Sequence, residues 1–242
     1  MKKVSIRKAS NREHALLPTA LKKDSIKKAS NREQIVAACI EQLCEKSTFK
    51  VAKQLTGTLV IVNKQNFGLL KDCCRLFAGV DSLVSPSKTT SERFWKVYLK
   101  PGFAAAVVRY AGETIGIFTI ECISAVDLQG VPKRWRCKSF DRKSGVENFV
   151  EVQGFEMPQY GDRDAARVNR IQQVVMTGWQ HFVATIMTLK KVNGCIIVYE
   201  HGMEHETIFG GTKFADAVGM KKSEEYFKAK GLGLIGSFVL RK

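Results

Sequence analysis

The sequence predicts an α/β protein of the α+β type, with a mixed central sheet that follows a helical amino-terminal portion. Strand-like and helix-like runs alternate after residue 100, which is the order expected of a mixed sheet. Hydrophobic residues make up 45% of the 242 residues, enough for a sizeable core. No apolar run reaches the roughly 18 residues that a membrane-spanning helix needs, so we expect no membrane partner. We expect three parts, namely an arm at 1–33, a helical or mixed portion at 34–100 and the sheet at 101–242.

The arm contains a short tandem repeat. Ser5–Glu13 recurs as Ser25–Glu33 with eight of nine positions identical and a period of 20 residues. Two copies are too few for a repeat array, which needs about three. Pro18 interrupts the pattern after the first copy, whereas the second leads into an amphipathic run. We therefore expect the first copy to be mobile and the second to join the fold.

The elements before residue 100 follow from hydrophobic spacing and from breaker residues. Apolar residues at helical spacing predict two helices, and branched residues predict a strand between them. In order we expect a helix at 34–44, a helix end or connector at 49–55, a strand at 58–62, a helix at 67–77 and a polar loop at 82–91.

The second part of the chain begins with a hairpin. Two apolar runs flank the short turn Ala111–Glu113, which is a hairpin signal. In order we expect strands at 103–110 and 114–122, strands joined by exposed loops at 128–165, a strand at 168–176, a helix at 179–191, a strand at 195–199, a short helix at 212–218 and a strand at 234–240.

The order from residue 103 onward resembles the Gcn5-related N-acetyltransferase (GNAT) fold over about 140 residues. The hairpin Tyr110–Ile117 is similar to the one before that family's acyl-CoA strand, and the expected strand, helix and strand follow it. The resemblance implies acetyl-CoA or another acyl-CoA as cofactor, provided that the site is functional. The family's pyrophosphate loop would fall at Met176–His181, where only one glycine is kept. The implied cofactor-binding residues are Thr177, Gly178, Trp179 and Gln180.

The same resemblance implies two catalytic candidates. Glu121 stands at the end of the central strand, where the family sometimes has a glutamate that acts as a base. The family's acidic tyrosine on the final helix is replaced by Ala215, and Tyr226 would substitute only if the tail folds back. A solvated Glu121 is the alternative reading. These departures indicate a degenerate GNAT-like site and leave open whether the protein is an enzyme.

Charge is the strongest compositional signal. Lys and Arg number 39 against 23 Asp and Glu, a net charge of +16. Residues 1–33 hold ten basic and three acidic side chains, residues 133–143 hold six and one, and residues 213–242 hold seven and three. Clustered cations of this kind are typical of proteins that bind a polyanion, because neutralised phosphates release counterions. A soluble basic surface with no such partner is the alternative.

We therefore predict a nucleic-acid partner that is held by its backbone, with DNA and RNA not distinguished. Basic residues alternate with Trp135 and Phe140 in the internal run, and a stacking role for Phe140 is a further hypothesis. The candidate contacts are Arg7, Lys8, Arg12, Lys27, Lys28, Arg32, Lys133, Arg134, Arg136, Lys138, Arg142 and Lys143.

Other chemistry is weakly signalled. His201 and His205 fit the H-x-x-E-H pattern of some zinc peptidases, but Gly202 lies between them and no distant third ligand follows, so they are at most an incidental metal site. The seven cysteines include no C-x-x-C pair, which favours reduced thiols in the cytosol, or a host cell's cytosol.

Two functions remain open at this point. We favour a basic, nucleic-acid-associated protein with a non-catalytic binding or assembly role, of the kind encoded by viruses or mobile elements. The alternative is a GNAT-type acyltransferase that acts on nucleic acid or on a substrate bound to it, loosely similar to phage Mom-type DNA-modifying proteins. The donor, the acceptor and the oligomeric state, including a homo-oligomer, are not determined by the sequence.

Overall fold

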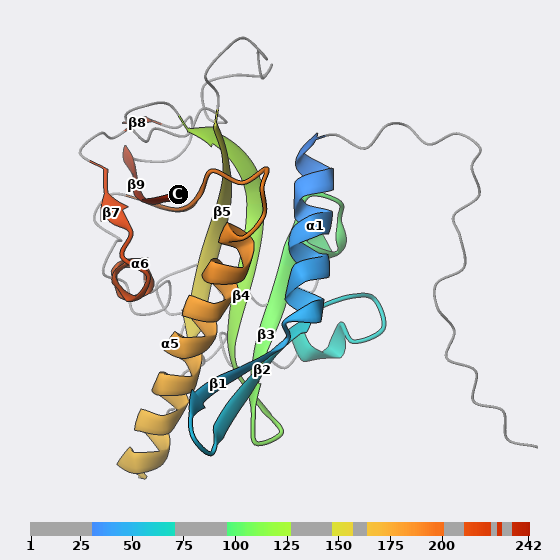
Figure 1. Ribbon diagram of the computed structural model, residues 1–242, viewed down its shortest axis with the longest axis vertical. Helices are drawn as coiled ribbons and strands as arrows, with labels where there is room; N and C mark the ends of the chain where they lie inside the picture. The colour runs from blue at the N-terminus through green and yellow to red at the C-terminus, as the bar shows by residue number, and fades with distance from the viewer. Residues whose placement is uncertain are drawn as a thin grey trace, which may run out of the picture.

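The computed structural model describes residues 31–70, 96–126, 147–156, 164–200, 211–223, 227–228 and 234–242. The predicted α+β class is confirmed, because helices pack against one mixed sheet (Figure 1). No helix in these ranges is long and apolar enough to cross a membrane. The elements are α1 (Asn31–Glu45), β1 (Thr48–Ala52), β2 (Leu55–Ile61), the 3-10 helix η1 (Lys96–Leu99), β3 (Ala104–Tyr110), β4 (Glu113–Val126), β5 (Glu147–Glu156), α5 (Ala165–Met187), β6 (Gly194–Glu200), α6 (Gly211–Ala217), β7 (Lys221–Lys222), β8 (Phe227–Lys228) and β9 (Leu234–Arg241).

The strand order is β1-β2-β3-β4-β5-β6-β9-β7, and β8 also pairs with β9. Within the described ranges β5 and β6 form the only parallel pair, and every other pair is antiparallel. A parallel pair needs a crossover connection, and α5 provides it. The boundary expected near residue 100 falls between η1 and β3, within this single sheet.

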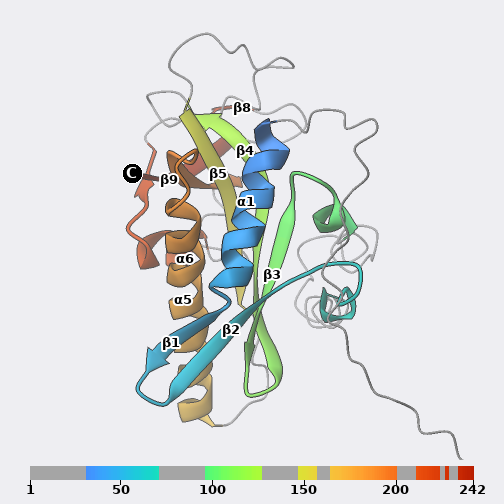
Figure 2. The ribbon, with the colours of Figure 1, turned by 45° about the vertical axis from the view of Figure 1, so that its right-hand side comes forward.

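The sheet is covered on both faces at β3, which explains why this strand is apolar from Ala104 to Val108. Alternate residues of β3 belong to different clusters: Ala104 and Val108 pack with α1 and α5, whereas Ala105 and Val107 pack with Tyr98 of η1 on the other face. Figure 2 shows α1 and α5 side by side on one face of the strands. We call this the helix face, and the other side the opposite face.

Local signals account for the elements that were predicted correctly. The helix expected at 34–44 is α1, whose buried residues Ile35, Val36, Cys39 and Leu43 share one side at helical spacing. The predicted hairpin is confirmed as β3 and β4. Its turn places Ala111 at φ 49° and Gly112 at φ 83°, the left-handed pair that a two-residue hairpin turn requires.

Two expected elements are wrong. Residues 49–55 were expected to end a helix or to connect, but β1 and the start of β2 lie there and pair with one another. Residues 168–176 were expected to form a strand, but they are the first half of α5. Their branched residues suggested a strand, whereas the buried ones, Ile171, Val174 and Val175, follow the three- and four-residue spacing of a helix. The helix expected at 179–191 is the second half of the same element.

The remaining predictions agree with the structure where it describes them. The strand expected at 195–199 is β6, the helix at 212–218 is α6 and the last strand is β9. One strand, β5, lies within the polar stretch at 128–165. The helix expected at 67–77 is described only at Gly68–Leu70, and the loop at 82–91 and residues 1–30 of the arm lie outside the described residues. The last three residues of the second repeat copy, at 31–33, begin α1.

Candidate functional site

The parallel strands β5 and β6 separate after a short contact. They pair only through Phe149–Glu151 of β5 and Gly194–Ile196 of β6. Beyond this contact β5 continues to Glu156 along β4, and β6 continues to Glu200 along β9. The facing edges of 152–156 and 197–200 therefore have no strand partner in the described structure. We call the space between these two edges the wedge.

One side chain spans the wedge. Gln153 of β5 donates its Nε2 hydrogen to the carbonyl oxygen of Val198 on β6 at 2.9 Å. This carbonyl points from β6 toward β5, where the ladder of the parallel pair would have continued. A side-chain amide therefore occupies a position that is normally filled by a strand, and it keeps the two edges at a defined separation.

The short helix α6 closes the helix face of the wedge. Its Phe214 ring lies against Gly154 of β5, where an added Cβ would be 2.7 Å from a ring carbon. Lys213 of α6 forms an ion pair with Glu156 at the end of β5. Any larger residue at position 154 would displace the ring, so Gly154 is required for this close approach.

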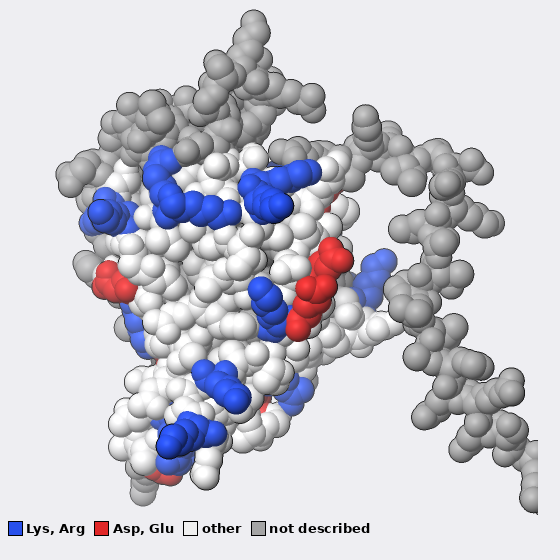
Figure 3. Space-filling model, viewed as in Figure 1, with Lys and Arg blue, Asp and Glu red and all other residues white. Residues whose placement is uncertain are grey.

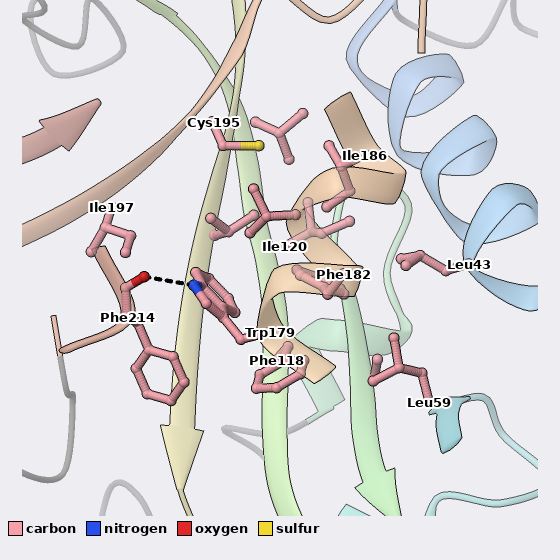
Figure 4. Packing of buried hydrophobic residues seen from close by; sticks show 14 of the residues in the cluster. Leu43, Leu59, Phe118, Ile120, Trp179, Phe182, Ile186, Cys195, Ile197 and Phe214 are labelled. Atoms are coloured by element: carbon pink, nitrogen blue, oxygen red, sulfur yellow. Dashed lines mark hydrogen bonds between the residues drawn. The ribbon is translucent and has the colours of Figure 1, made fainter. Parts of the chain in front are cut away.

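Two side chains of α5 hold α6 in place. Trp179 donates its Nε1 hydrogen to the Phe214 carbonyl at 2.7 Å, and Gln180 donates from Nε2 to the Ala217 carbonyl at 2.8 Å. These carbonyls lie in the last turn of α6, where a helix leaves its acceptors without intrahelical partners. Figure 4 shows the Trp179 bond beside the rings of Phe118, Phe182 and Phe214, with which the indole packs at centroid distances of 5.1 to 5.8 Å.

A buried carboxylate lies at the point where the strands separate. Glu151 is 3% exposed and is the only charged side chain that is buried among the described residues. Its neighbours Val150 and Val152 belong to the helix-face core, so the alternation of a strand places Glu151 and Gln153 on the opposite face. Thr119 of β4, which is fully buried, pairs with Gln153 there. A buried carboxylate is costly unless it is paired or hydrogen-bonded, so Glu151 is a candidate functional residue.

The predicted cofactor loop is misplaced. Thr177, Gly178, Trp179 and Gln180 lie inside α5 rather than at the start of a helix. Their backbone N–H groups are therefore used within the helix, Gly178 packs against Phe49, and Trp179 is fully buried. This placement removes the basis on which these four residues were expected to contact a pyrophosphate. The connection from β5 into α5 is residues 157–164, of which the structure describes only Asp164.

That connection ends at a well-formed helix start. Asp164 is the N-cap of α5, and its Oδ1 accepts a hydrogen bond from the Arg167 backbone N–H at 3.0 Å. The Arg167 guanidinium also reaches Glu113 at the β3–β4 turn at 2.6 Å. Consequently the positive end of a 23-residue helix is fixed beside the hairpin turn, near the end of β5 that borders the wedge.

Of the two predicted catalytic residues, the structure describes the backbone of Glu121 and does not describe Tyr226. The backbone of Glu121 lies at an irregularity of β4, between Ile120, which pairs with Val152, and Cys122, which pairs with Glu151. Glu121 is thus a sequence neighbour of the residue that pairs with Glu151, which the sequence analysis did not single out. Tyr226 and the two histidines of the weak metal motif, His201 and His205, lie outside the described residues. In the described ranges no group of three or more potential metal ligands occurs.

Most of the predicted nucleic-acid contacts are not described. Arg32 is exposed near the start of α1, and its guanidinium carbon is 5.3 Å from the centroid of the Phe103 ring. The other predicted contacts lie outside the described ranges: Arg7, Lys8, Arg12, Lys27, Lys28, Lys133, Arg134, Arg136, Lys138, Arg142 and Lys143.

The described cysteines are free thiols. Cys39 and Cys195 are buried and Cys44 is exposed. Burial raises the pKa of the Cys39 thiol to about 12, and burial is also the main cause of the raised pKa of Cys195. Because the reactive species is the thiolate, neither buried cysteine is suited to act as a nucleophile.

Comparisons with known proteins add little to this geometry. No family model and no curated protein matches the chain. Among solved structures, the GNAT domain of S. lividans PAT is 9% identical, with a TM-score of 0.46 over 77% of this chain and 91% of that one. A structure of AAC(6')-Ib with acetyl-CoA is 10% identical, with a TM-score of 0.48 over 77% and 93%. A ribosomal-protein-serine acetyltransferase structure from Vibrio cholerae is 12% identical, with a TM-score of 0.46 over 80% and 98%. TM-scores below 0.5 do not establish a shared fold, so the fold described above rests on its own strand order.

Proposed function

We propose that the chain is an acyltransferase that binds an acyl-CoA in the wedge between β5 and β6. The observation that carries this proposal is the early separation of the only parallel pair in the described sheet. An extended ligand with amide groups can bind along main-chain edges that no strand covers, as added strands do. The pantetheine arm of CoA is a ligand of this kind.

The residues around the wedge fit the rest of such a cofactor. The first N–H groups of α5 and the positive end of its dipole suit a pyrophosphate, with Arg170 nearby. The proposed pyrophosphate site is therefore at the start of α5, next to its N-cap Asp164, and not at residues 177–180, where the sequence predicted it. The apolar packing of Phe214 against Gly154 keeps water from the helix face of the wedge.

Glu151 is the group that we assign to proton transfer. In acyl transfer from a thioester, a nucleophilic acceptor such as an amine attacks the carbonyl carbon, the C–S bond breaks and the thiol of CoA leaves. The acceptor must lose a proton, and Glu151 is the buried carboxylate at the closed end of the wedge, where the two strands separate. We propose that it takes this proton, directly or through a water molecule, while Thr119 and Gln153 position the acceptor side of the site.

A substitution of Glu151 tests the assignment. Glu151→Gln keeps the size and hydrogen-bonding capacity of the side chain but removes its charge. We expect release of free CoA from acetyl-CoA, in the presence of a panel of amine acceptors, to fall about 100-fold or more. Acetyl-CoA affinity, measured by titration calorimetry, should change less than about threefold, because the proposed cofactor contacts are main-chain groups. Glu41→Gln, at an exposed position of α1 that does not border the wedge, is the control and should retain turnover.

The results separate the alternatives. If wild-type protein binds neither acetyl-CoA nor CoA, the proposed cofactor site is wrong. If it binds them without turnover of any acceptor, the non-catalytic role favoured by the sequence is supported instead. Equal losses in the Glu151 and Glu41 variants would show that the effect is not specific to the wedge and would remove Glu151 from the mechanism.

The nature of the acceptor is a second part of the proposal. The net charge of +16 supports a nucleic acid, or a substrate bound to one, as in the Mom-type modification considered above. Supplying duplex DNA, single-stranded RNA and small amines as separate acceptors in the CoA-release assay tests this. Turnover with amines and none with either nucleic acid would exclude nucleic acid as the acceptor.

A further inference from the structure

A second surface lies at the end of the sheet where β9 finishes and β6 begins. Arg241 pairs with Gly194, and the backbone N–H of Lys242 donates to the Asn193 carbonyl at 3.0 Å. The Lys242 ammonium donates to the Leu189 carbonyl at 2.6 Å. These bonds fix the residues at the end of β9 against the connection between α5 and β6.

The start of β5 supports the same connection. Asn148 donates from Nδ2 to the Lys191 carbonyl at 3.2 Å, and its backbone N–H donates to Asn193 Oδ1 at 2.9 Å. Three separate segments therefore meet within hydrogen-bonding distance of one another. The arrangement is a built structural feature rather than a chance approach of loose loops.

Four exposed cationic side chains lie where these three segments meet. They are Lys190, Lys191, Arg241 and Lys242, which we call the end surface. The sequence holds no acidic residue in 188–194 or in 236–242. Figure 3 shows the blue Lys and Arg side chains gathered over this end of the described surface, with no red atoms between them.

Two features give the end surface a definite form. The Arg241 guanidinium carbon lies 5.0 Å from the centroid of the Phe149 ring, which orients an otherwise mobile side chain. Lys221 and Lys222 of β7 pair with Val239 and Phe238 of β9 and are also exposed. Lys221 shares its face with Val239 and Arg241, whereas Lys222 lies on the other face, over the Tyr199 ring. Since a strand rises about 3.3 Å per residue, Lys221 alone extends the cationic strip, by roughly 7 Å.

The chemistry of the strip favours phosphates over lipid. The apolar residues beneath it, Phe149 and Cys195, are fully buried, so the described strip offers cations without an exposed apolar group to enter a bilayer. Side chains on one face of a strand repeat about every 6.6 Å, which is close to the spacing of alternate phosphates along one strand of a duplex, about 6.8 Å.

We propose that the end surface binds the phosphate backbone of a nucleic acid. This contact is distinct from the predicted contacts at the amino terminus and at 133–143. It requires no base recognition, so affinity should depend on salt and little on sequence.

The test uses the full chain with Lys190→Gln and Lys191→Gln combined, and a labelled 20-base-pair DNA of mixed sequence as the probe. If each lysine contacts one phosphate, the slope of log K against log salt should become shallower by about 2, and affinity at 100 mM NaCl should fall at least about tenfold. The control combines Lys50→Gln and Lys53→Gln at the β1–β2 turn. It has the same change in net charge at the other end of the sheet (Figure 1) and should stay within about twofold of wild type.

Three results would overturn the proposal. An unchanged slope in the Lys190 and Lys191 variant would place binding elsewhere. Equal weakening by both pairs of substitutions would show that net charge alone governs binding. Tighter binding to phosphatidylserine vesicles than to the DNA at equal salt would identify a membrane surface instead. Acetyl-CoA binding should be the same in all three proteins, which separates this result from the acyltransferase proposal.

Discussion

The attachment of α6 to α5 allows a quantitative test of what holds the wedge in shape. Trp179→Phe keeps an aromatic ring in the core but removes the donor to the Phe214 carbonyl. That carbonyl is buried, so leaving it without this hydrogen bond costs about 1–3 kcal/mol. The smaller ring also loses apolar contact worth about 1 kcal/mol. Together these effects predict a loss of about 2–4 kcal/mol in the free energy of unfolding.

The neighbouring residue provides the comparison. Gln180 makes a similar bond, at 2.8 Å, to the carbonyl of Ala217, but that bond is exposed. Water can replace the lost donor, so Gln180→Ala should cost less than about 1 kcal/mol. Both variants remove one contact between the same two helices, and they differ mainly in burial.

Urea unfolding followed by far-ultraviolet circular dichroism measures both variants against wild type. The far-ultraviolet signal reports secondary structure and does not depend on Trp179 fluorescence. A Trp179→Phe protein that is destabilised no more than Gln180→Ala would refute the reasoning, because it would mean that the buried acceptor finds another partner at no cost.

Two further predictions concern the core. Gly154→Ala should destabilise the protein by about 1–3 kcal/mol in the same urea assay, because the new Cβ would be 2.7 Å from the Phe214 ring. Gly68→Ala is the control. It should change stability by less than about 0.5 kcal/mol, because its new Cβ would have no atom within 4 Å. Site-resolved mass spectrometry after iodoacetamide treatment should find Cys44 labelled, and Cys39 and Cys195 protected until the protein unfolds. Burial raises the pKa of Cys39 from 9.0 to about 12, so the labelling of Cys39 in the folded protein should not increase between pH 7 and 9. In urea, where the thiol is exposed, the labelling should increase over the same pH range. An increase in both states would contradict the assigned burial.

The elements predicted correctly are those specified by local sequence. The β3–β4 turn needs two residues that tolerate positive φ, and a Gly at position 112 signals it. By contrast, the role of Phe49 in β1 depends on distant residues. Its ring fills space left by Gly57 and Gly178, where an added Cβ would be 2.3 Å and 2.8 Å from ring carbons. Gly178 was interpreted as the one remaining glycine of a pyrophosphate loop, but its lack of a side chain serves this packing inside α5.

The wedge could not be predicted for a related reason. The alternation around Glu151 is visible in the sequence, and it places Val150 and Val152 on the face opposite to the carboxylate. Alternation does not reveal which strand edges are paired, and the function proposed for Glu151 depends on β6 leaving β5 immediately beyond it. Glu151 is the last residue of β5 that pairs with β6, so it lies next to the unpaired edge that begins at Val152 and next to a ligand that this edge would bind.

The end surface leads to the same conclusion for charge. Counting cations along the chain identified the arm, the internal run and the tail, yet Lys190 and Lys191 belong to a segment whose net charge is mildly negative. They become part of a cationic surface only because Gly194 pairs with Arg241, which brings the end of β9 to the loop after α5. Since the strength of phosphate binding depends on how many cations act together, it is set by this register as much as by composition. The Lys190 and Lys191 variant and its charge-matched control therefore distinguish a surface created by folding from the general attraction of a basic chain.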